Sequence, residues 1–179
     1  MRTIIRKWFW AWDFDKEETW LNEMAAKGMA LVGVGWCRYE FEPCEPGEYI
    51  VRLQMLEKKR TSQESAEYLA FLEETGAEHV GSWMDWVYLR RKASEGEFEL
   101  FSDNASRIRQ LGIVKLLVAV IGGLNLYIAG YNLVLFAMMR IGFNLLGLLN
   151  LAIGIAAMIG VYRLHRMQAR LRQDQQLFE

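Results

Sequence analysis

The sequence is poor in the residues that build disulfide frameworks and metal sites. Among 179 residues it has two cysteines, Cys37 and Cys44, and two histidines, His79 and His165. A structural zinc site needs three or four Cys or His ligands at suitable spacing, so we expect no metal, and no other cofactor motif is present. A Cys37–Cys44 disulfide is compatible with the spacing, but two free thiols in a reducing cytosol fit better.

Charged side chains are scarce in the second half of the chain. Residues 112–164 contain three of them, Lys115, Arg140 and Arg163, and no Asp or Glu. Residues 1–111, in contrast, carry 15 basic and 20 acidic side chains. This contrast argues against a fully soluble protein and against a purely membrane-embedded one. Apart from the short C-terminal tail no segment is strongly basic, so direct binding to nucleic acid is not expected.

The domain organisation predicted from this contrast has four parts. They are a cytosolic domain over residues 1–92, a bridge and leading helix over 93–111, a transmembrane helical hairpin over 112–164, and a basic cytosolic tail over 165–179. Two apolar segments of the hairpin, about 112–132 and 141–162, each approach the ~20 residues needed to cross a bilayer core. A buried helical hairpin in a soluble protein is the alternative, but a small domain cannot cover that much apolar surface.

The flanking charges predict how this hairpin is oriented. Lys and Arg accumulate on the cytoplasmic side of membrane proteins. The connection near Tyr131–Arg140 has Arg140 alone. The inner ends of the spans carry seven basic residues, namely Arg107, Arg109, Lys115, Arg163, Arg166, Arg170 and Arg172. We therefore expect a multi-pass protein of the cell membrane, in contact with lipid, with both termini in the cytoplasm.

Small and amide side chains in the spans are candidates for helix packing. Small residues four apart let helix backbones approach closely, and mid-span amides seek hydrogen-bond partners. The candidates are Ala119, Gly123, Asn125, Asn150, Ala152, Ala156 and Gly160. They would join the two helices or the protomers of a homo-oligomer; for the two asparagines a place along a substrate path is the alternative.

Residues 1–92 alternate strand and helix patterns in the order β-α-β-β-α-β. Strands are predicted near 2–12, 31–42, 48–55 and 80–91. The capping boxes Asp15/Glu18 and Thr61/Glu64 predict the starts of two helices. This order indicates an α+β fold of the ferredoxin-like sandwich type, followed by the two-helix transmembrane hairpin. Many functions share such a sandwich, so the fold does not reveal one.

An internal similarity supports the prediction of a pseudo-symmetric domain. The segment containing Trp20-Leu21, Gly28 and Val32-Gly33 recurs 48 residues later as Tyr68-Leu69, Gly76 and Val80-Gly81. By the same shift, Tyr39 and Phe41 correspond to Val87 and Leu89. The two halves of a ferredoxin-like sandwich would produce such a repeat, although chance matching over so few positions is an alternative.

Tryptophan is unusually frequent in the first half of the chain. Trp8, Trp10 and Trp12 would share one face of the first strand. If that face is open, the three indoles form an apolar patch for a partner, a ligand or a membrane. If it faces the helices, they are core residues.

No set of residues indicates catalysis. The sequence has no evident nucleophile–base pair and no glycine-rich phosphate loop ahead of a helix. Gly33 and Gly35 lack the third glycine of a dinucleotide-binding fingerprint. We therefore expect that the protein is not an enzyme.

Several segments resemble one bacterial protein family. They are Lys16–Gly28 (KEETWLNEMAAKG), Tyr39–Phe41, Gly47–Tyr49 and Phe98–Asp103. They are similar to the family called domain of unknown function 2812, whose members are often encoded beside PadR-type repressors. The resemblance implies a cytosolic domain on a membrane hairpin with a link to transcriptional control, and it supplies no site residues. The expected function is thus a membrane-anchored binding or regulatory module with a protein or small-ligand partner. An accessory subunit of a transporter or of an oligomeric membrane assembly is the alternative.

Overall fold

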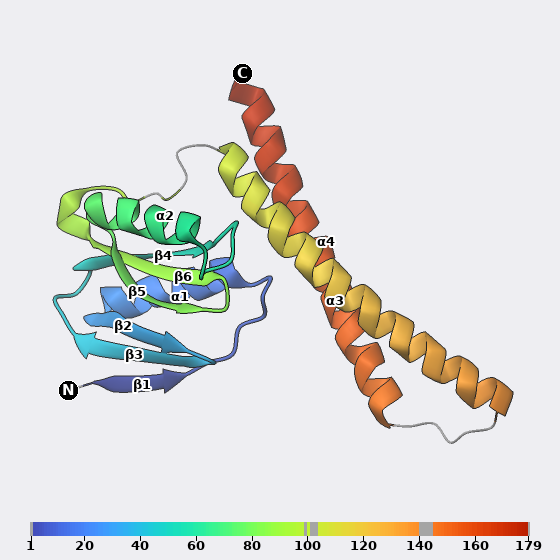
Figure 1. Ribbon diagram of the computed structural model, residues 1–179. Coiled ribbons are helices and arrows are strands. Elements are labelled where there is room, and N and C mark those ends of the chain that lie inside the picture. Colours follow the sequence, from blue (N-terminus) through green and yellow to red (C-terminus); the bar gives the residue numbers. More distant parts are fainter. Residues whose placement is uncertain (1, 99, 101–103, 140–144, 179) are drawn as a thin grey trace. The chain divides into compact units, whose positions relative to one another are not determined.

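The computed structural model describes residues 2–98, 100, 104–139 and 145–178 (Figure 1). The chain divides into two compact units, Met1–Ser102 and Asp103–Glu179. The first unit contains β1 (Thr3–Arg6), α1 (Phe14–Ala26), β2 (Met29–Gly35), β3 (Arg38–Pro43), β4 (Tyr49–Met55), α2 (Gln63–Glu74), β5 (Glu78–Trp83), β6 (Trp86–Lys92) and the short 3-10 helix η1 (Ala93–Glu95). The second contains α3 (Asn104–Met139) and α4 (Leu145–Phe178). The α+β class, followed by two long apolar helices, is confirmed.

The strands of the first unit form two antiparallel sheets rather than one four-stranded ferredoxin-like sheet. Their orders are β1-β3-β2 and β4-β6-β5. The predicted strands over 31–42 and 80–91 are each divided by a two-residue hairpin turn. These turns lack the Asn-Gly or Asp-Gly signature from which hairpins are usually recognised. Instead Cys37 and Met84 adopt positive φ values of 52° and 53°.

The domain is therefore a βαββ unit that occurs twice. The 48-residue similarity in the sequence falls on equivalent structural positions. Gly28 and Gly76 follow α1 and α2 with φ values of 79° and 90°, a left-handed backbone that favours glycine. The strand after each helix has an irregular register at the same place, between Leu31 and Gly33 in β2 and between His79 and Gly81 in β5.

Helix α1 lies between the two sheets, and α2 covers the outer face of the second sheet (Figure 1). The larger core combines Leu21 and Met24 of α1 with side chains from both sheets, such as Phe41 and Leu53. A smaller core joins α2 to the other face of the second sheet. It includes Phe98, which is 3% exposed, so the start of the predicted bridge belongs to the folded domain.

Polar side chains fix α1 to the first strand of the second repeat. The side-chain amide of Asn22 donates to the Val51 carbonyl at 2.9 Å, and its oxygen accepts from the Val51 N–H at 2.9 Å. Glu18 accepts from the Leu53 N–H at 2.8 Å. The predicted capping role of Glu18 is therefore wrong, because its carboxylate reaches β4, and α1 begins after Asp13. Ser62 caps α2 by accepting from the Ser65 N–H, one residue after the predicted Thr61.

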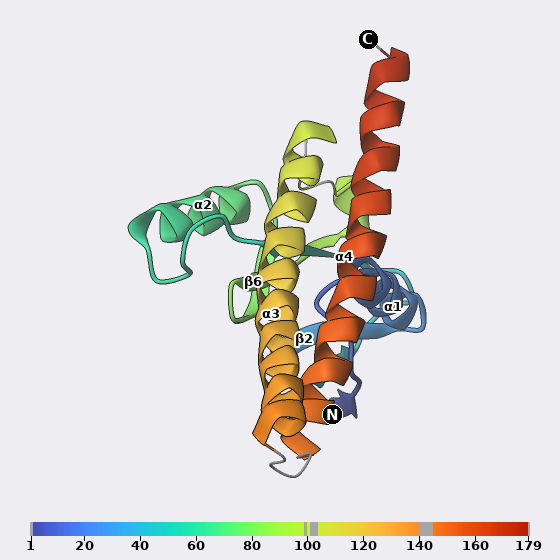
Figure 2. The same ribbon diagram turned by 90° about the vertical axis from the view of Figure 1, so that its right-hand side faces the viewer.

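The second unit is a pair of helices that lie side by side (Figure 2). Segments Arg107–Met138 and Leu145–Gln173 are long and apolar enough to cross a membrane. The connection predicted to begin at Tyr131 is helical up to Met139, because residues 133–139 contain no glycine or proline. The described part of the predicted tail after residue 164 is likewise helical, as part of α4. Arg140 lies outside the described residues.

Two glycines allow close packing of α3 and α4. A Cβ atom at Gly122 would lie 2.7 Å from the Cβ of Ala157, and one at Gly154 would lie 2.6 Å from Leu126 Cδ2. Neither glycine was among the predicted packing residues, although the Gly122-Gly123 pair and the spacing of Gly154 and Ala157 carry a small-residue signal. A polar contact also joins the first half of α3 to the second half of α4: Lys115 Nζ donates to Gln168 Oε1, which lies 2.5 Å away.

We predict that Gly122→Val destabilises the hairpin and that Gly123→Val does not. A side chain at 122 must displace Ala157, whereas no atom lies within 4 Å of a Cβ built at 123. Overpacking of this kind costs about 1–3 kcal/mol. Thermal unfolding of the full chain in detergent, followed by the far-ultraviolet circular dichroism of the helices, measures the difference. Equal unfolding temperatures for the two variants would contradict the packing described.

Candidate functional site: the aromatic end of the domain

Four loops of the first unit meet at one end of the domain. The β1–α1 and β2–β3 loops adjoin, since the Lys7 N–H donates to the Cys37 carbonyl at 3.1 Å. The β4–α2 and β5–β6 loops adjoin in the same way, through the Leu56 N–H and the Asp85 carbonyl at 2.8 Å. These are equivalent loops of the two repeats.

The two pairs of loops come together because β2 and β5 run side by side in the same direction. The Arg90 guanidinium donates to the Leu31 carbonyl at 2.8 Å, and Arg90 is the register partner of Glu78 at the start of β5. Three residues further along each strand, a Cβ at Gly81 would lie 2.9 Å from Val34 Cγ2. Both strands therefore end at the same end of the domain. We call residues 6–13, 35–38, 56–62 and 83–86 the aromatic end.

The three predicted patch tryptophans lie in the β1–α1 connection and not in a strand, since β1 ends at Arg6. Trp8 is 55% exposed and Trp10 is 44% exposed. Their rings meet edge to face at 5.6 Å, and Trp10 stacks on Trp12 with centroids 4.9 Å apart. The three indoles thus form a contiguous aromatic row, and none belongs to either core cluster of the domain.

Phe9, which lies between these tryptophans, points the other way. Its ring packs on Trp20 at 5.7 Å and on Tyr39 at 6.4 Å, against the larger core. The ammonium group of Lys7 lies 4.5 Å from the centre of the Trp20 ring. Side chains along this connection therefore alternate: Phe9 is anchored on the core, and its neighbours Trp8 and Trp10 point outward.

The hairpin turns add further exposed apolar side chains that sequence reasoning did not assign to a site. Trp36 is 70% exposed, Trp83 is 41% exposed and Met84 is 71% exposed. They lie at or beside the equivalent turns of the two repeats, at the same end of the domain as the row of indoles. The 48-residue repeat was the signal that could have placed the two turns together, but the turns themselves were hidden within predicted strands.

The aromatic end is also rich in basic residues. The aromatic end carries six of them, namely Arg6, Lys7, Arg38, Lys58, Lys59 and Arg60, and all are exposed. Its three acidic residues are Asp13, Glu57 and Asp85. Asp13 pairs with Lys16 at 2.8 Å, and Asp85 accepts from the Arg60 N–H at 3.4 Å. Arg38 and Lys58 pair with Glu40 and Glu64 outside this end, at 2.9 Å and 3.6 Å. Residues 1–102 as a whole have 13 basic and 19 acidic side chains, so the aromatic end is basic within an acidic domain.

A buried carboxylate lies inside the domain. Glu17 Oε1 accepts hydrogen bonds from the hydroxyls of Tyr39 at 2.7 Å and of Tyr88 at 2.6 Å. Burial raises the pKa of Glu17, and the two hydrogen bonds oppose that increase. Burial and the neighbouring carboxylate also raise the pKa values of both tyrosines, so the tyrosines remain protonated donors. Because the two donors come from different repeats, this contact joins the repeats and has a structural role.

The structure separates the predicted helix-packing residues. Gly160 is buried, Ala119 and Ala156 are half-buried, and Gly123 and Ala152 are exposed. The side-chain amides of Asn125 and Asn150 donate to carbonyls one turn earlier in their own helices, each at 2.8 Å. Whether the exposed members contact another protomer stays a prediction.

Metal ligands do not cluster in the part of the chain that the structure describes. No group of three or more His, Cys, Asp or Glu side chains there could hold a metal ion. Cys37 and Cys44 are free thiols and both are half-buried. Desolvation is the main cause that raises the pKa of the Cys44 thiol.

An α+β domain with a basic aromatic end, followed by two apolar helices, is thus the class of protein that these features define. The chain belongs to the family described as protein of unknown function (DUF2812), whose model matches residues 13–121. The matched segment runs from the residue before α1 to the first half of α3. No match was found among curated proteins or among solved structures.

The raised pKa of Glu17 predicts a specific pH dependence of stability. An unfolded glutamate has a pKa of about 4.3. Between that value and the raised folded value the unfolded chain ionises first, so the contribution of Glu17 to stability is lost as pH rises. The stability advantage of the wild type over Glu17→Gln should therefore be larger at acidic than at neutral pH. Urea unfolding followed by tryptophan emission at several pH values measures it.

Tyr88→Phe is the matched variant for this experiment. It keeps the carboxylate but removes a donor that favours the ionised form. The wild-type loss of stability with rising pH should therefore become steeper in Tyr88→Phe and shallower in Glu17→Gln. Parallel pH profiles for all three proteins would show that Glu17 is not shielded from solvent as described.

Proposed function

We propose that this protein is a membrane-anchored, non-catalytic regulatory module that recruits a cytosolic protein partner to the membrane. The observation that supports it best is the direct continuity of a folded α+β domain with two helices of membrane-spanning length. Such an arrangement confines a binding domain to a surface and raises its local concentration there.

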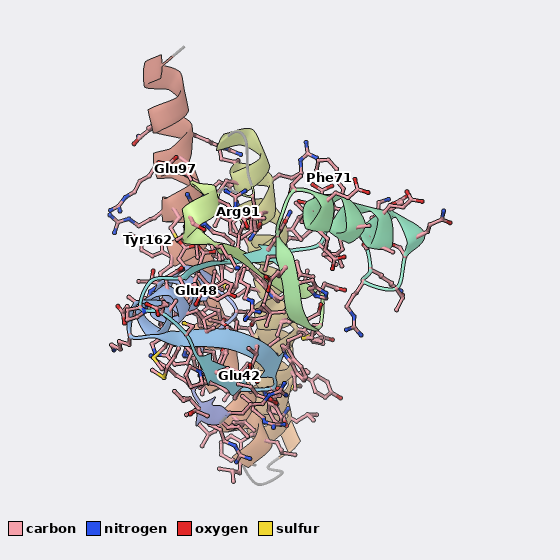
Figure 3. All side chains as sticks on the ribbon, turned by 90° about the vertical axis from the view of Figure 1, so that its left-hand side faces the viewer. Glu42, Glu48, Phe71, Arg91, Glu97 and Tyr162 are labelled. Atoms are coloured by element: carbon pink, nitrogen blue, oxygen red, sulfur yellow. The ribbon has the colours of Figure 1, made fainter. Side chains whose placement is uncertain are left out.

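The outer side of α2 is the surface that we assign to the partner. Phe71 projects from this helix with 57% of its surface exposed (Figure 3). Glu64, Glu67 and Glu74 are exposed at helical spacings on the same side. An exposed aromatic ring among carboxylates suits a basic protein surface with an apolar pocket, because an aromatic anchor supplies affinity and charge complementarity supplies specificity.

A PadR-type transcriptional regulator is the partner class that we propose. The family resemblance implies a link to such repressors, and a DNA-binding protein carries basic surface for the phosphate backbone. The acidic stripe around Phe71 would compete for that surface. Membrane recruitment would then alter how much of the regulator is free to bind DNA.

We expect Phe71→Ala to weaken binding of the neighbouring PadR-type repressor to the full chain in lipid nanodiscs. Loss of a central aromatic anchor costs about 2 kcal/mol or more, which is roughly a 30-fold weaker affinity. Ile4→Ala is the matched control, because Ile4 is 52% exposed on β1 in the other sheet. Titration calorimetry or interferometry measures both.

Two results would count against this assignment. Equal affinities of wild type and Phe71→Ala would remove α2 as the surface. Absence of repressor binding, together with repeated copurification of an integral membrane protein, would favour the alternative of an accessory subunit. That alternative is compatible with the small residues exposed on the hairpin, Gly123 and Ala152.

Both termini should face the cytoplasm. In a chain whose two native cysteines are replaced by serine, Met138→Cys should react with an impermeant thiol reagent on intact cells, and Ser94→Cys should not. Met138 is 79% exposed near the end of α3, whereas Ser94 lies in η1, which belongs to the α+β domain. The basic residues that flank the inner ends are the physical cause. Labelling of Ser94→Cys alone would invert the topology.

A further inference from the structure

We propose that the aromatic end of the domain docks on the interface of the bilayer that anchors the chain, and that it prefers anionic lipid. This inference rests on the membrane anchorage of the proposed function. It adds a second, reversible lipid contact made by the α+β domain itself. The acidic remainder of the domain, including α2, would then be left to the cytosol and to a protein partner.

The chemistry of the exposed side chains fits the head-group region. Tryptophan is enriched where membrane meets water, because its ring is apolar and its N–H still finds a polar acceptor. Trp8, Trp10, Trp36 and Trp83 are all more than two-fifths exposed at this one end. Met84, 71% exposed, adds a flexible apolar side chain at the same place.

Charge complementarity identifies the lipid. Six of the 13 Lys and Arg of residues 1–102 lie at the aromatic end, with three of the 19 Asp and Glu. Each basic residue near an anionic surface contributes about 1 kcal/mol of attraction. The acidic remainder of the domain is repelled by the same surface. The domain therefore has an electrostatic polarity that orients the indoles towards an anionic bilayer.

The chain keeps the domain within reach of that surface. Five residues, 99–103, separate Phe98 in the smaller core from Asn104 at the start of α3. Fully extended, this segment would span at most about 20 Å. A weak interfacial contact is sufficient under this restraint, because the tethered domain meets the bilayer at a high effective concentration.

The placement of tryptophan makes the contact measurable in the full chain. All seven tryptophans precede residue 87, so none lies in α3 or α4. The full chain would be reconstituted in vesicles of phosphatidylcholine and phosphatidylglycerol, with and without brominated acyl chains, which quench indoles at the membrane. If the four exposed indoles insert, about half of the emission should be lost with brominated lipid. The loss should be smaller in vesicles of phosphatidylcholine alone.

Two pairs of variants retain every tryptophan and separate the contributions. Met84→Asp places a charge in the β5–β6 turn of the aromatic end, where aspartate tolerates the positive φ. Phe71→Asp, at an exposed apolar residue on α2, is its control. The triple variant Lys58→Gln/Lys59→Gln/Arg60→Gln removes three positive charges from the aromatic end. Its control, Lys27→Gln/Lys92→Gln, removes two exposed positive charges outside that end. Met84→Asp should lower quenching at least about twofold, and the triple variant should abolish the preference for anionic lipid. Both controls should behave like the wild type.

Flotation of the same vesicles distinguishes failure of this inference from failure of the anchorage. Protein that floats with the vesicles but shows no brominated-lipid quenching would overturn lipid docking and leave the anchorage intact. Quenching that is equal in Met84→Asp, Phe71→Asp and the wild type would also overturn it. Protein that does not float at all would refute the anchorage, and docking of the tethered domain with it.

Discussion

The first unit depends on one carboxylate that two tyrosine hydroxyls share. Glu17 lies on α1, and its donors Tyr39 and Tyr88 belong to β3 of the first sheet and β6 of the second. Each neutral donor offsets part of the cost of burying a charged group. The other links between the two sheets are the adjacency of β2 and β5, the Arg90–Leu31 hydrogen bond, and α1, whose Asn22 and Glu18 bind β4. A central polar contact of this kind fixes which face of the helix belongs to which sheet.

Local sequence signals predicted the class of the fold and the approximate place of both domain helices. They failed where a side chain that was predicted to cap its own helix makes a tertiary contact instead. Glu18 has the spacing of a capping box, yet its carboxylate accepts from Leu53 in a strand 35 residues away. The hairpins failed for a different reason, because Cys37 and Met84 adopt a backbone conformation that propensity assigns to Gly, Asn or Asp. Each undetected turn converted two short strands into one long predicted strand.

The candidate site was predictable only in its first part. The alternation of Trp8, Phe9 and Trp10 indicates two faces, but it does not reveal which face is buried. That choice is made by Trp20 and Tyr39, which hold Phe9 and leave the indoles outside. Trp36 and Met84 join the site through the adjacency of β2 and β5, a non-local relation that periodicity cannot provide. In the hairpin, small-residue spacing located packing surfaces, but it did not distinguish Gly122 from Gly123.

The helices of the two βαββ units differ in how many sheets they contact. The residues that fix α1 at the centre, Glu17, Glu18 and Asn22, correspond after the 48-residue shift to Ser65, Ala66 and Ala70 of α2. At these positions the second helix lacks the polar groups that bind α1 to two sheets, and it covers one. A helix in that position can change its outer side chains without disturbing the centre of the fold. The repeat thus places the structural constraint on the first helix and leaves the outer side of the second open to substitution.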